Sequence, residues 1–415
     1  MTRIRILVVD DSIVIRKVLS DTLSQDPELE VVGTASDGRI ALSKIPVLKP
    51  DLITLDVEMP VMDGLQTLVE LRKLYAKLPV IMFSTLTERG GAATLDALSL
   101  GASDYATKPS NTGSPAAAIE RVRAELIPKI KALCGRVTLK LQALPRTRPV
   151  PKVRPRSNPR IEIVAIGTST GGPNALAEVL PRIPNDFPVP IVVVQHMPPI
   201  FTRLLAERLA SRSSIPVEEG SAGAVLSAGH AWIAPGNFHM KVVRAGSQWR
   251  LNLDQSAPEN SCRPAVDVLF RSVAVAYGAN VLGVVMTGMG SDGVLGAQNI
   301  RDAGGNVVIQ DEASSVVWGM PGLVHASGLD DAAYPVDQLA GEIMRRVLMS
   351  RSSLPHVDRK NADPKTIDQK TVEQKNVDQK MVDQKSINQI NINQKSIDQK
   401  NADQKHYATL EPRAK

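Results

Sequence analysis

Three aspartates and a lysine in the N-terminal part of the chain have the chemistry of a site that accepts a phosphoryl group. Asp10 and Asp11 follow one apolar run, Asp56 ends another, and Lys108 follows a third. Mg²⁺ prefers a few carboxylates together with water, so the adjacent pair Asp10 and Asp11 can hold the metal. Asp56 is then the better candidate nucleophile for an acyl phosphate. Lys108 can pair with the added phosphate charge, and Ser84 can donate a hydrogen bond to it.

A second group of residues is typical of a serine hydrolase. Ser169 lies in a G-x-S-x-G turn, directly after an apolar run and before a helical pattern. Such a turn exposes a hydroxyl at a helix N-terminus, where backbone N–H groups can stabilise an anion. The turn alone leaves phosphate binding or simple helix capping open. His196 follows the next apolar run and can act as the base, and Asp292 follows a third and can hold the imidazole tautomer.

Two alternatives stay open at this level. Residues 288–293, GMGSDG, match the G-x-G-x-x-G dinucleotide fingerprint, with Asp311 further on as a candidate ribose ligand. This unit comes late in its domain, and the segment IQDEAS after it looks like a loop, which argues against a dinucleotide site. Other histidines could replace His196 as the base, but they lie in irregular or β-rich segments: 230, 239 and 325. The chain order Ser, His, Asp also differs from that of the α/β-hydrolases, which predicts a different fold.

Regular α/β elements are needed to position both groups. Strand-like runs alternate with amphipathic helical stretches over residues 1–110, and we expect five strands, at 4–10, 31–35, 52–56, 80–84 and 104–108. This rhythm predicts a doubly wound, five-stranded parallel sheet with helices on both faces. Each acidic residue then lies at the carboxyl edge of the sheet, where open α/β sheets hold their ligands.

The same rhythm returns in the second half and predicts another α/β domain with a mostly parallel sheet. Continuous apolar runs are expected to form its central strands, at 161–167, 189–195 and 280–288, with helices at 173–180, 201–210 and 293–303. Residues 217–256 look β-rich and predict an antiparallel insertion. The predicted organisation is therefore a first domain (1–125), a basic Pro-rich linker (126–160), a second domain (161–350) and a low-complexity tail (351–415).

Composition restricts the class of protein. No run of 18 apolar residues occurs, which argues against a membrane span. Only two cysteines occur, which fits a reducing cytosol better than a disulfide scaffold. Residues 136–160 hold eight basic residues among prolines, but they lack aromatic residues to stack on bases, so a linker is favoured over a nucleic-acid site. The nine five-residue units from residue 361 form no hydrophobic stripe and predict a disordered tail rather than a solenoid.

The first motifs resemble those of a response-regulator receiver domain. The segments VVDDS, LDVEMPVMDG and YATKP carry this resemblance, which covers about residues 1–125. It implies phosphorylation of Asp56 by a histidine kinase. It further implies that Ser84 and Tyr105 report the phosphoryl group by shifting position, and that Mg²⁺ is held by Asp10, Asp11, Asp56 and the Glu58 carbonyl.

The later motifs resemble the catalytic domain of the chemotaxis protein-glutamate methylesterases, the CheB family. They are IGTSTGGP, VVVQHMPP, APGN, CRPAVDVLF and MTGMGSDG, and they cover about residues 161–350. The resemblance implies that Ser169 is the nucleophile, His196 the base and Asp292 its orienting acid. The backbone N–H groups of Thr170 and Met289 would form the oxyanion hole. No cofactor is expected in this domain.

The resemblance implies a phosphorylation-activated esterase of chemotactic adaptation. Its substrates would be glutamate γ-methyl esters on chemoreceptors, with methanol released, and receptor glutamines could be deamidated at the same site. We expect a cytoplasmic protein recruited to receptor arrays, without nucleic-acid partners or membrane insertion. The alternative is a signalling adaptor with the same fold that acts by binding, without hydrolysis.

Overall fold

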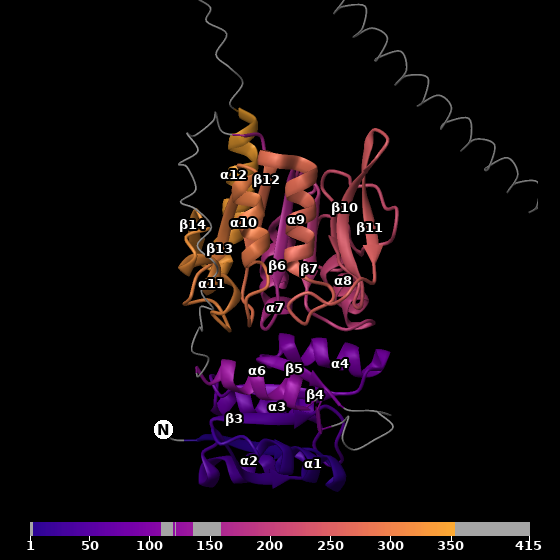
Figure 1. Ribbon diagram of the computed structural model, residues 1–415. Helices are drawn as coiled ribbons and strands as arrows, with labels where there is room; N and C mark the ends of the chain where they lie inside the picture. The colour runs from indigo at the N-terminus through magenta and orange to yellow at the C-terminus, as the bar shows by residue number, and fades with distance from the viewer. Residues whose placement is uncertain (1–2, 109–118, 121, 136–158, 353–415) are drawn as a thin grey trace, which may run out of the picture. The chain divides into compact units, whose positions relative to one another are not determined.

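The computed structural model describes residues 3–108, 119–120, 122–135 and 159–352 (Figure 1). Most of the predicted linker and nearly all of the predicted tail lie outside the described residues. The proposed domain boundaries therefore stay predictions. Among the described helices, none is long and apolar enough to cross a membrane.

The first sheet has five parallel strands in the order β2-β1-β3-β4-β5. Its strands are β1 (Ile4–Val9), β2 (Leu29–Ala35), β3 (Leu52–Asp56), β4 (Val80–Ser84) and β5 (Asp104–Thr107). The helices that follow the first four strands are α1 (Ile13–Leu23), α2 (Gly38–Leu48), α3 (Gly64–Leu74) and α4 (Glu88–Ser99). The sheet confirms the predicted doubly wound fold and the five predicted strands.

Both faces of the first sheet are buried, as the continuous apolar strands require. In β1, Ile6 and Val8 pack with α1 and with the short helices η1 (Val122–Leu126) and α6 (Ile127–Leu133). The alternate residues, Leu7 and Val9, pack on the opposite face with α2, α3 and α4. Period-two side-chain alternation thus divides the strand between two helical layers.

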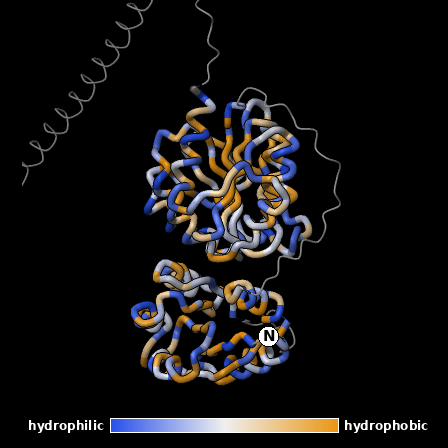
Figure 2. The backbone as a smooth tube through the Cα atoms, turned by 90° about the vertical axis from the view of Figure 1, so that its left-hand side faces the viewer, coloured by the Kyte–Doolittle hydropathy of each residue, from blue (hydrophilic) through white to orange (hydrophobic). Residues whose placement is uncertain are grey.

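The second sheet has seven parallel strands in the order β14-β13-β12-β6-β7-β9-β8. Its strands are β6 (Ile163–Thr168), β7 (Ile191–Gln195), β8 (Val217–Glu219), β9 (Ala231–Ile233), β12 (Val281–Val285), β13 (Asn306–Gln310) and β14 (Ala332–Tyr334). Its helices are α7 (Gly172–Val179), α8 (Phe201–Ala210), α9 (Val266–Tyr277), α10 (Val294–Asp302), α11 (Met320–Ala326) and α12 (Val336–Ser352). Figure 2 shows hydrophobic positions concentrated along the strands inside this domain.

The β-rich insertion is smaller than the sequence suggested. Only β10 (His239–Ala245) and β11 (Gln248–Asp254) form an antiparallel hairpin. The short strands β8 and β9 instead extend the parallel sheet, because β9 pairs with β7 and β8 pairs with β9. Of the segment IQDEAS (309–314), expected to be loop-like, Ile309 and Gln310 belong to the buried strand β13, and the rest forms a turn.

Candidate functional site

Two buried carboxylates of the first sheet share one lysine. Asp10 follows β1 and Asp56 ends β3, and their exposed fractions are 0% and 2%. The Lys108 Nζ atom lies 2.9 Å from Asp10 Oδ2 and 2.7 Å from Asp56 Oδ2. Burial outweighs this lysine and raises the pKa of Asp56 to about 6, and burial also raises the pKa of Asp10. One cation is therefore too little to neutralise the site.

A divalent cation fits this site, which we call the acidic pocket: Asp10, Asp11, Asp56 and Lys108. One carboxylate oxygen from each aspartate can be chosen so that all three lie within 4.8 Å of one another. The backbone N–H of Glu58 donates to Asp56 Oδ1 at 3.3 Å, which places the Glu58 main chain at the pocket. Hard oxygen donors with excess negative charge are the ligands that Mg²⁺ prefers.

The two predicted reporter residues contact different surroundings. The Ser84 hydroxyl donates to the Gly90 carbonyl in the first turn of α4, at 3.1 Å. Tyr105 is buried, and its ring stacks on Phe201 of α8 with ring centroids 5.1 Å apart. Burial raises the pKa of Tyr105 well above its usual value, so the ring stays neutral. The predicted roles of Ser84 and Tyr105 in signalling stay predictions.

Ser169 lies in a crowded turn between β6 and α7. Its backbone N–H donates to the Thr287 carbonyl at 3.0 Å. Gly171 has a φ of +79°, and a Cβ at Gly172 would lie 1.9 Å from Oε1 of Gln195. A residue with a side chain would therefore be strained at the first position and would clash at the second. The sharp turn that the sequence predicted needs both glycines.

His196 and Asp292 form a direct hydrogen bond. His196 follows β7 and Asp292 follows β12, and His196 Nε2 lies 2.7 Å from Asp292 Oδ2. Burial opposes the charged forms of both groups, but their mutual interaction outweighs it. The pKa of His196 is raised, and that of Asp292 is lowered. The carboxylate stays ionised and fixes the orientation of the imidazole ring.

The other imidazole nitrogen faces a thiol in this state. The Nδ1 atom of His196 lies 3.6 Å from Cys262 Sγ, and no hydrogen bond among the described residues joins His196 to the Ser169 hydroxyl. Ser169 is nevertheless close to the turn after β12, because a Cβ at Gly288 would lie 2.9 Å from Ser169 Cβ. Met289 is the next residue in that turn. The structure thus brings the segments of the predicted triad and oxyanion hole to one edge, and the roles of these residues stay predictions.

The rival residues are engaged elsewhere. His230 stacks on Trp232, and the ring of His239 bonds to the Ala257 carbonyl. His325 lies beside Asp330. Asp311 accepts hydrogen bonds from the backbone and side chain of Ser314, as a turn-capping residue does.

Sequence reasoning missed two residues behind Asp292. Asp267 is 1% exposed and lies in the first turn of α9, and its backbone N–H donates to Asp292 Oδ1 at 2.9 Å. Asn260 Nδ2 donates to the same oxygen at 3.0 Å. An aspartate inside the apolar stretch AVDVLF was the available signal, because a buried carboxylate needs donors nearby.

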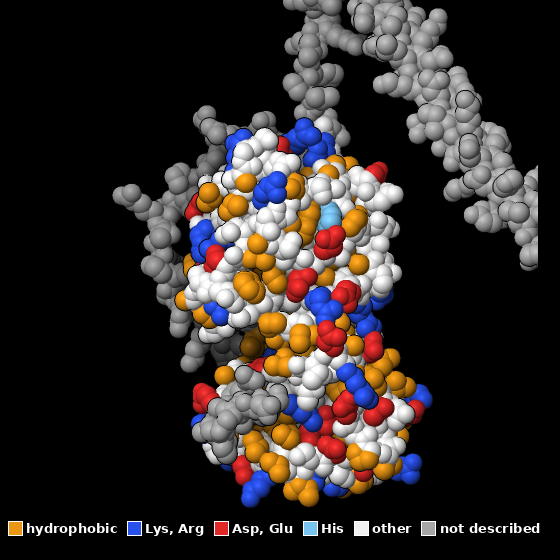
Figure 3. All heavy atoms as spheres, turned by 90° about the vertical axis from the view of Figure 1, so that its right-hand side faces the viewer, with side chains coloured by type: hydrophobic (Ala, Val, Ile, Leu, Met, Phe, Trp, Pro, Cys, Tyr) orange, Lys and Arg blue, Asp and Glu red, His pale blue; other side chains and the backbone are white. Residues whose placement is uncertain are grey.

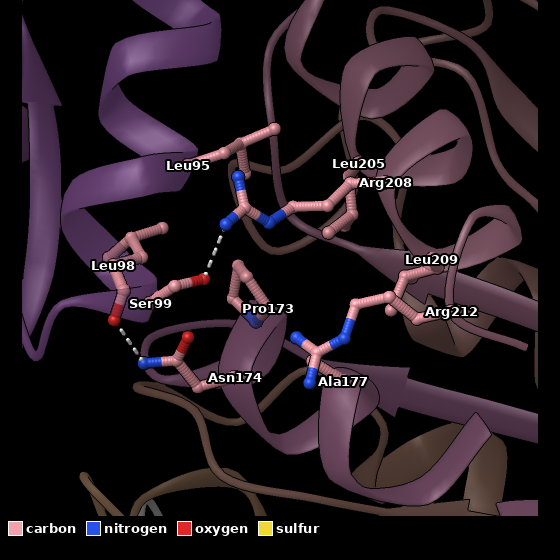
Figure 4. Close-up of a pocket in the computed structure, with 10 residues that line it drawn as sticks. All are labelled: Leu95, Leu98, Ser99, Pro173, Asn174, Ala177, Leu205, Arg208, Leu209 and Arg212. Carbon is pink, nitrogen blue, oxygen red and sulfur yellow. Dashed lines mark hydrogen bonds between the residues drawn. The ribbon is translucent and has the colours of Figure 1, made fainter. Parts of the chain in front are cut away.

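Residues around the Ser169 turn also contact the first sheet and α4. Thr170 Oγ1 donates to Asp104 Oδ2 at 2.8 Å, and Lys129 Nζ lies 3.2 Å from the same oxygen. Asn174 Nδ2 donates to the Leu98 carbonyl at 2.8 Å, as Figure 4 shows. The contacts place the end of α4 and the start of β5 against the turn that carries Ser169.

Charged pairs continue this contact along α8. Arg208 binds Asp96 at 2.5 Å and Ser99 at 2.9 Å, and the Ser99 bond is drawn in Figure 4. Arg203 binds Glu88 at 2.5 Å. Figure 3 shows basic and acidic side chains gathered on this face of the molecule. The interface combines a buried polar contact at Thr170 with exposed ion pairs along its edge.

Comparison with known proteins gives two family matches. The model described as CheB methylesterase matches residues 164–343, and the response regulator receiver domain model matches residues 6–120. A protein-glutamate methylesterase/protein-glutamine glutaminase of Trichodesmium erythraeum is 55% identical over 84% of this chain and 100% of its own length. A protein of the same name from a Nocardioides species is 50% identical over 85% of this chain and 98% of its own. The solved catalytic domain of Thermotoga maritima CheB methylesterase is 40% identical, covering 45% of this chain and 98% of its own, with a TM-score of 0.44.

Proposed function

We infer that this chain, which belongs to the CheB family of protein-glutamate methylesterases, is a phosphorylation-regulated methylesterase of chemotaxis. Its substrates are γ-glutamyl methyl esters on chemoreceptors, and its product is methanol. The two relatives described above are also named protein-glutamine glutaminases, and we propose that this chain likewise deamidates receptor glutamines. The observation that carries the proposal is the 2.7 Å bond between His196 and Asp292 beside the Ser169 turn.

The geometry supports a separate role for each residue of this site. Because Nε2 of His196 is bonded to Asp292, the proton of the Ser169 hydroxyl goes to Nδ1. Ser169 Oγ then attacks the ester carbonyl, and the histidine returns the proton to the leaving methoxide. Water then attacks the acyl-enzyme carbonyl while His196 takes its proton, and the histidine returns that proton to Ser169 Oγ as the glutamate leaves. The Nδ1 atom faces Cys262 in this state, so a side-chain rotation must precede the attack.

The predicted oxyanion donors belong to the two turns that meet at Gly288. The backbone N–H groups of Thr170 and Met289 stabilise the charge that develops on the carbonyl oxygen. The close packing of Gly288 against Ser169 supports this assignment, since it brings the two turns within van der Waals distance.

The acidic pocket receives the signal. A histidine kinase transfers a phosphoryl group to Asp56, and Lys108 pairs with the added charge. Mg²⁺ fits the carboxylates of Asp10, Asp11 and Asp56 and the carbonyl of Glu58, and it would neutralise charge on the phosphoryl oxygens. The shared Lys108 supports this assignment, because it alone leaves two buried carboxylates under-neutralised.

Contacts at Thr170 support a gate. In the unphosphorylated state, Asp104 and α4 hold the residues next to the nucleophile, which restricts access of a receptor helix to Ser169. Phosphorylation of Asp56 shifts Ser84, whose hydroxyl bonds to the first turn of α4. The closed contact is then disfavoured and the open state gains population. We place the enzyme in the cytoplasm, recruited to receptor arrays.

Methanol release from methylated receptors tests the function. The wild-type chain should release methanol, and it should do so faster with a small phosphodonor. Replacement of Ser169 by alanine should abolish release in both conditions. Absence of release from the wild-type chain, with retained receptor binding, would favour the adaptor instead.

A further inference from the structure

A second buried carboxylate lies directly behind the predicted catalytic aspartate. Asp292 and Asp267 are 2% and 1% exposed, and Asn260 links them. The single Nδ2 atom of Asn260 donates to Asp267 Oδ2 at 2.9 Å and to Asp292 Oδ1 at 3.0 Å. Asn260 itself is exposed, so it covers the two carboxylates on their solvent side.

Asp292 has a full set of donors as a result. Its Oδ1 atom accepts from Asn260 and from the Asp267 backbone N–H. Its Oδ2 atom accepts from the Val266 backbone N–H at 2.6 Å and pairs with His196. Four contacts fix both the position and the rotation of this carboxylate. Two of them come from Asn260 and the main chain of Asp267.

Asp267 also holds the helix that follows Asp292. Its Oδ1 atom accepts from the backbone N–H of Gly293 at 2.9 Å and of Gly296 at 2.6 Å. These groups lie at the N-terminus of α10, whose N-cap Gly293 has no side chain to satisfy them. A carboxylate at that end is favoured by the helix dipole. Asp267 thus fixes the main chain on the C-terminal side of Asp292.

We propose that Asn260 and Asp267 are positioning residues for the proposed esterase reaction, which hold Asp292 against His196 and keep a second negative charge behind it. The inference rests on the proposed function of Ser169 and His196. The charge of Asp267 stabilises the imidazolium that forms when His196 takes the proton of Ser169. Burial, and next the charge of Asp292, raise the pKa of Asp267 to about 6, so it is ionised under mildly alkaline assay conditions.

Other titratable groups surround this pair. Arg271 of α9 forms a two-bonded ion pair with Glu259, at 3.0 and 2.8 Å. This pair is close to neutral as a unit. His196 faces Asp292 and the Cys262 thiol, and the imidazole of His239 lies on the side of Glu259. Asp267 therefore adds a charge next to Asp292, and its hydrogen-bond donors among the described residues are Asn260 and two backbone N–H groups rather than a cation.

The full-length Asp267→Asn variant, assayed with a phosphodonor, tests this charge. Its oxygen can still accept from Gly293 and Gly296, but the negative charge and the acceptor for Asn260 Nδ2 are lost. We expect kcat to fall by about tenfold with KM unchanged, and the acid limb of the pH profile to move to lower pH, because His196 loses a stabilising charge. Glu342→Gln is the matched control, since Glu342 is also a buried, multiply bonded carboxylate but lies outside the catalytic site. It should leave the pH profile unchanged.

Coupling to Asp292 separates positioning from general structure. In an Asp292→Ala background, Asp267→Asn should lower kcat by clearly less than in the wild-type chain, because the positioning role is lost with Asp292 and only the charge effect on His196 remains. An effect of unchanged size there, or an unshifted pH profile in the single variant, would overturn the proposal. Asn260→Ala is the second variant for the case in which Asp267→Asn does not fold, since Asn260 is exposed. It should lower kcat without changing KM, and wild-type kcat in this variant would also refute the inference. Loss of methanol release from the wild-type chain would instead refute the proposed function.

Discussion

Replacing Asp104 by alanine should release the gate without phosphorylation. Asp104 belongs to β5 of the first sheet and lies outside the catalytic site, but it accepts the Thr170 hydroxyl at 2.8 Å. Both residues are buried, at 4% exposure each. A hydrogen bond to a charged group contributes about 1.5–3 kcal/mol. Loss of this contact therefore changes the ratio of closed to open chains by about 10- to 150-fold.

Each of the other contacts across this interface contributes less free energy than the hydrogen bond between Asp104 and Thr170. Arg208 and Asp96 have side chains that are 30% and 56% exposed, and such pairs contribute about 0–1 kcal/mol. The stacked rings of Tyr105 and Phe201 add about 0.5–1.5 kcal/mol beyond their burial. The contact between Asp104 and Thr170 is therefore the best single target.

The assay is methanol release by the full-length chain without a phosphodonor. The Asp104→Ala variant should rise toward the phosphorylated rate of the wild-type chain, which sets the ceiling. Lys129→Met is the matched control, because it removes the ion pair to Asp104 at 3.2 Å but leaves the Thr170 bond in place. An equal rise in both variants would mean that a loosened receiver, not the lost bond, opens the gate. A basal rate within about twofold of wild type, in an Asp104→Ala chain that still accepts phosphate, would refute the reasoning.

Four further outcomes follow from the same geometry. Asp56→Asn should abolish activation by a phosphodonor and keep the basal rate. EDTA should do the same to the wild-type chain, since only the acidic pocket is expected to use Mg²⁺. Activation that survives either treatment would contradict that assignment. Gly172→Ala should lower kcat by about a hundredfold, because a Cβ would lie 1.9 Å from Gln195 Oε1, whereas Gly341→Ala has open space and should be neutral. The raised pKa of Asp267, about 6, means that ionisation costs the folded state up to about 3 kcal/mol, and this cost develops as the pH rises from about 4 to 6. Urea unfolding between those pH values should therefore lose less stability in Asp267→Asn than in the wild-type chain, and parallel curves would show that the cost is absent.

Strand ends were predictable because apolar runs and their polar terminators are local signals. Asp56 ends β3 and His196 follows β7, as the sequence indicated. The parallel direction of β8 and β9 was not predicted, for a different reason. Each has three residues, too few to show a period, and their direction is set by the pairing of β9 with β7 and of β8 with β9.

The support of Asp292, the predicted catalytic aspartate, could not be predicted for a related reason. Asn260 and Asp267 reach Asp292 from 32 and 25 positions away along the chain. Their contact depends on how α9 packs against α10, which is a tertiary event. The contact between Asp104 and Thr170 spans 66 positions and depends on the docking of two sheets. Local pattern identifies groups that can react, but it does not identify the groups that hold them.

Helix α4 contacts residues on both sides of the proposed gate. At its start, the Gly90 carbonyl accepts the hydroxyl of Ser84, the residue that ends β4 beside Asp56. One residue further on, a Cβ at Gly91 would lie 2.8 Å from Leu204 of α8, so this helix turn touches the catalytic domain directly. A small shift at Ser84 therefore meets a tightly packed contact, and packed interfaces change between discrete arrangements rather than deforming smoothly. In the last turn of the same helix, the Leu98 carbonyl accepts a hydrogen bond from Asn174, five residues after Ser169. Both ends of one helix are thus engaged, which supports the proposal that a phosphoryl group on Asp56 acts on Ser169 in the other sheet.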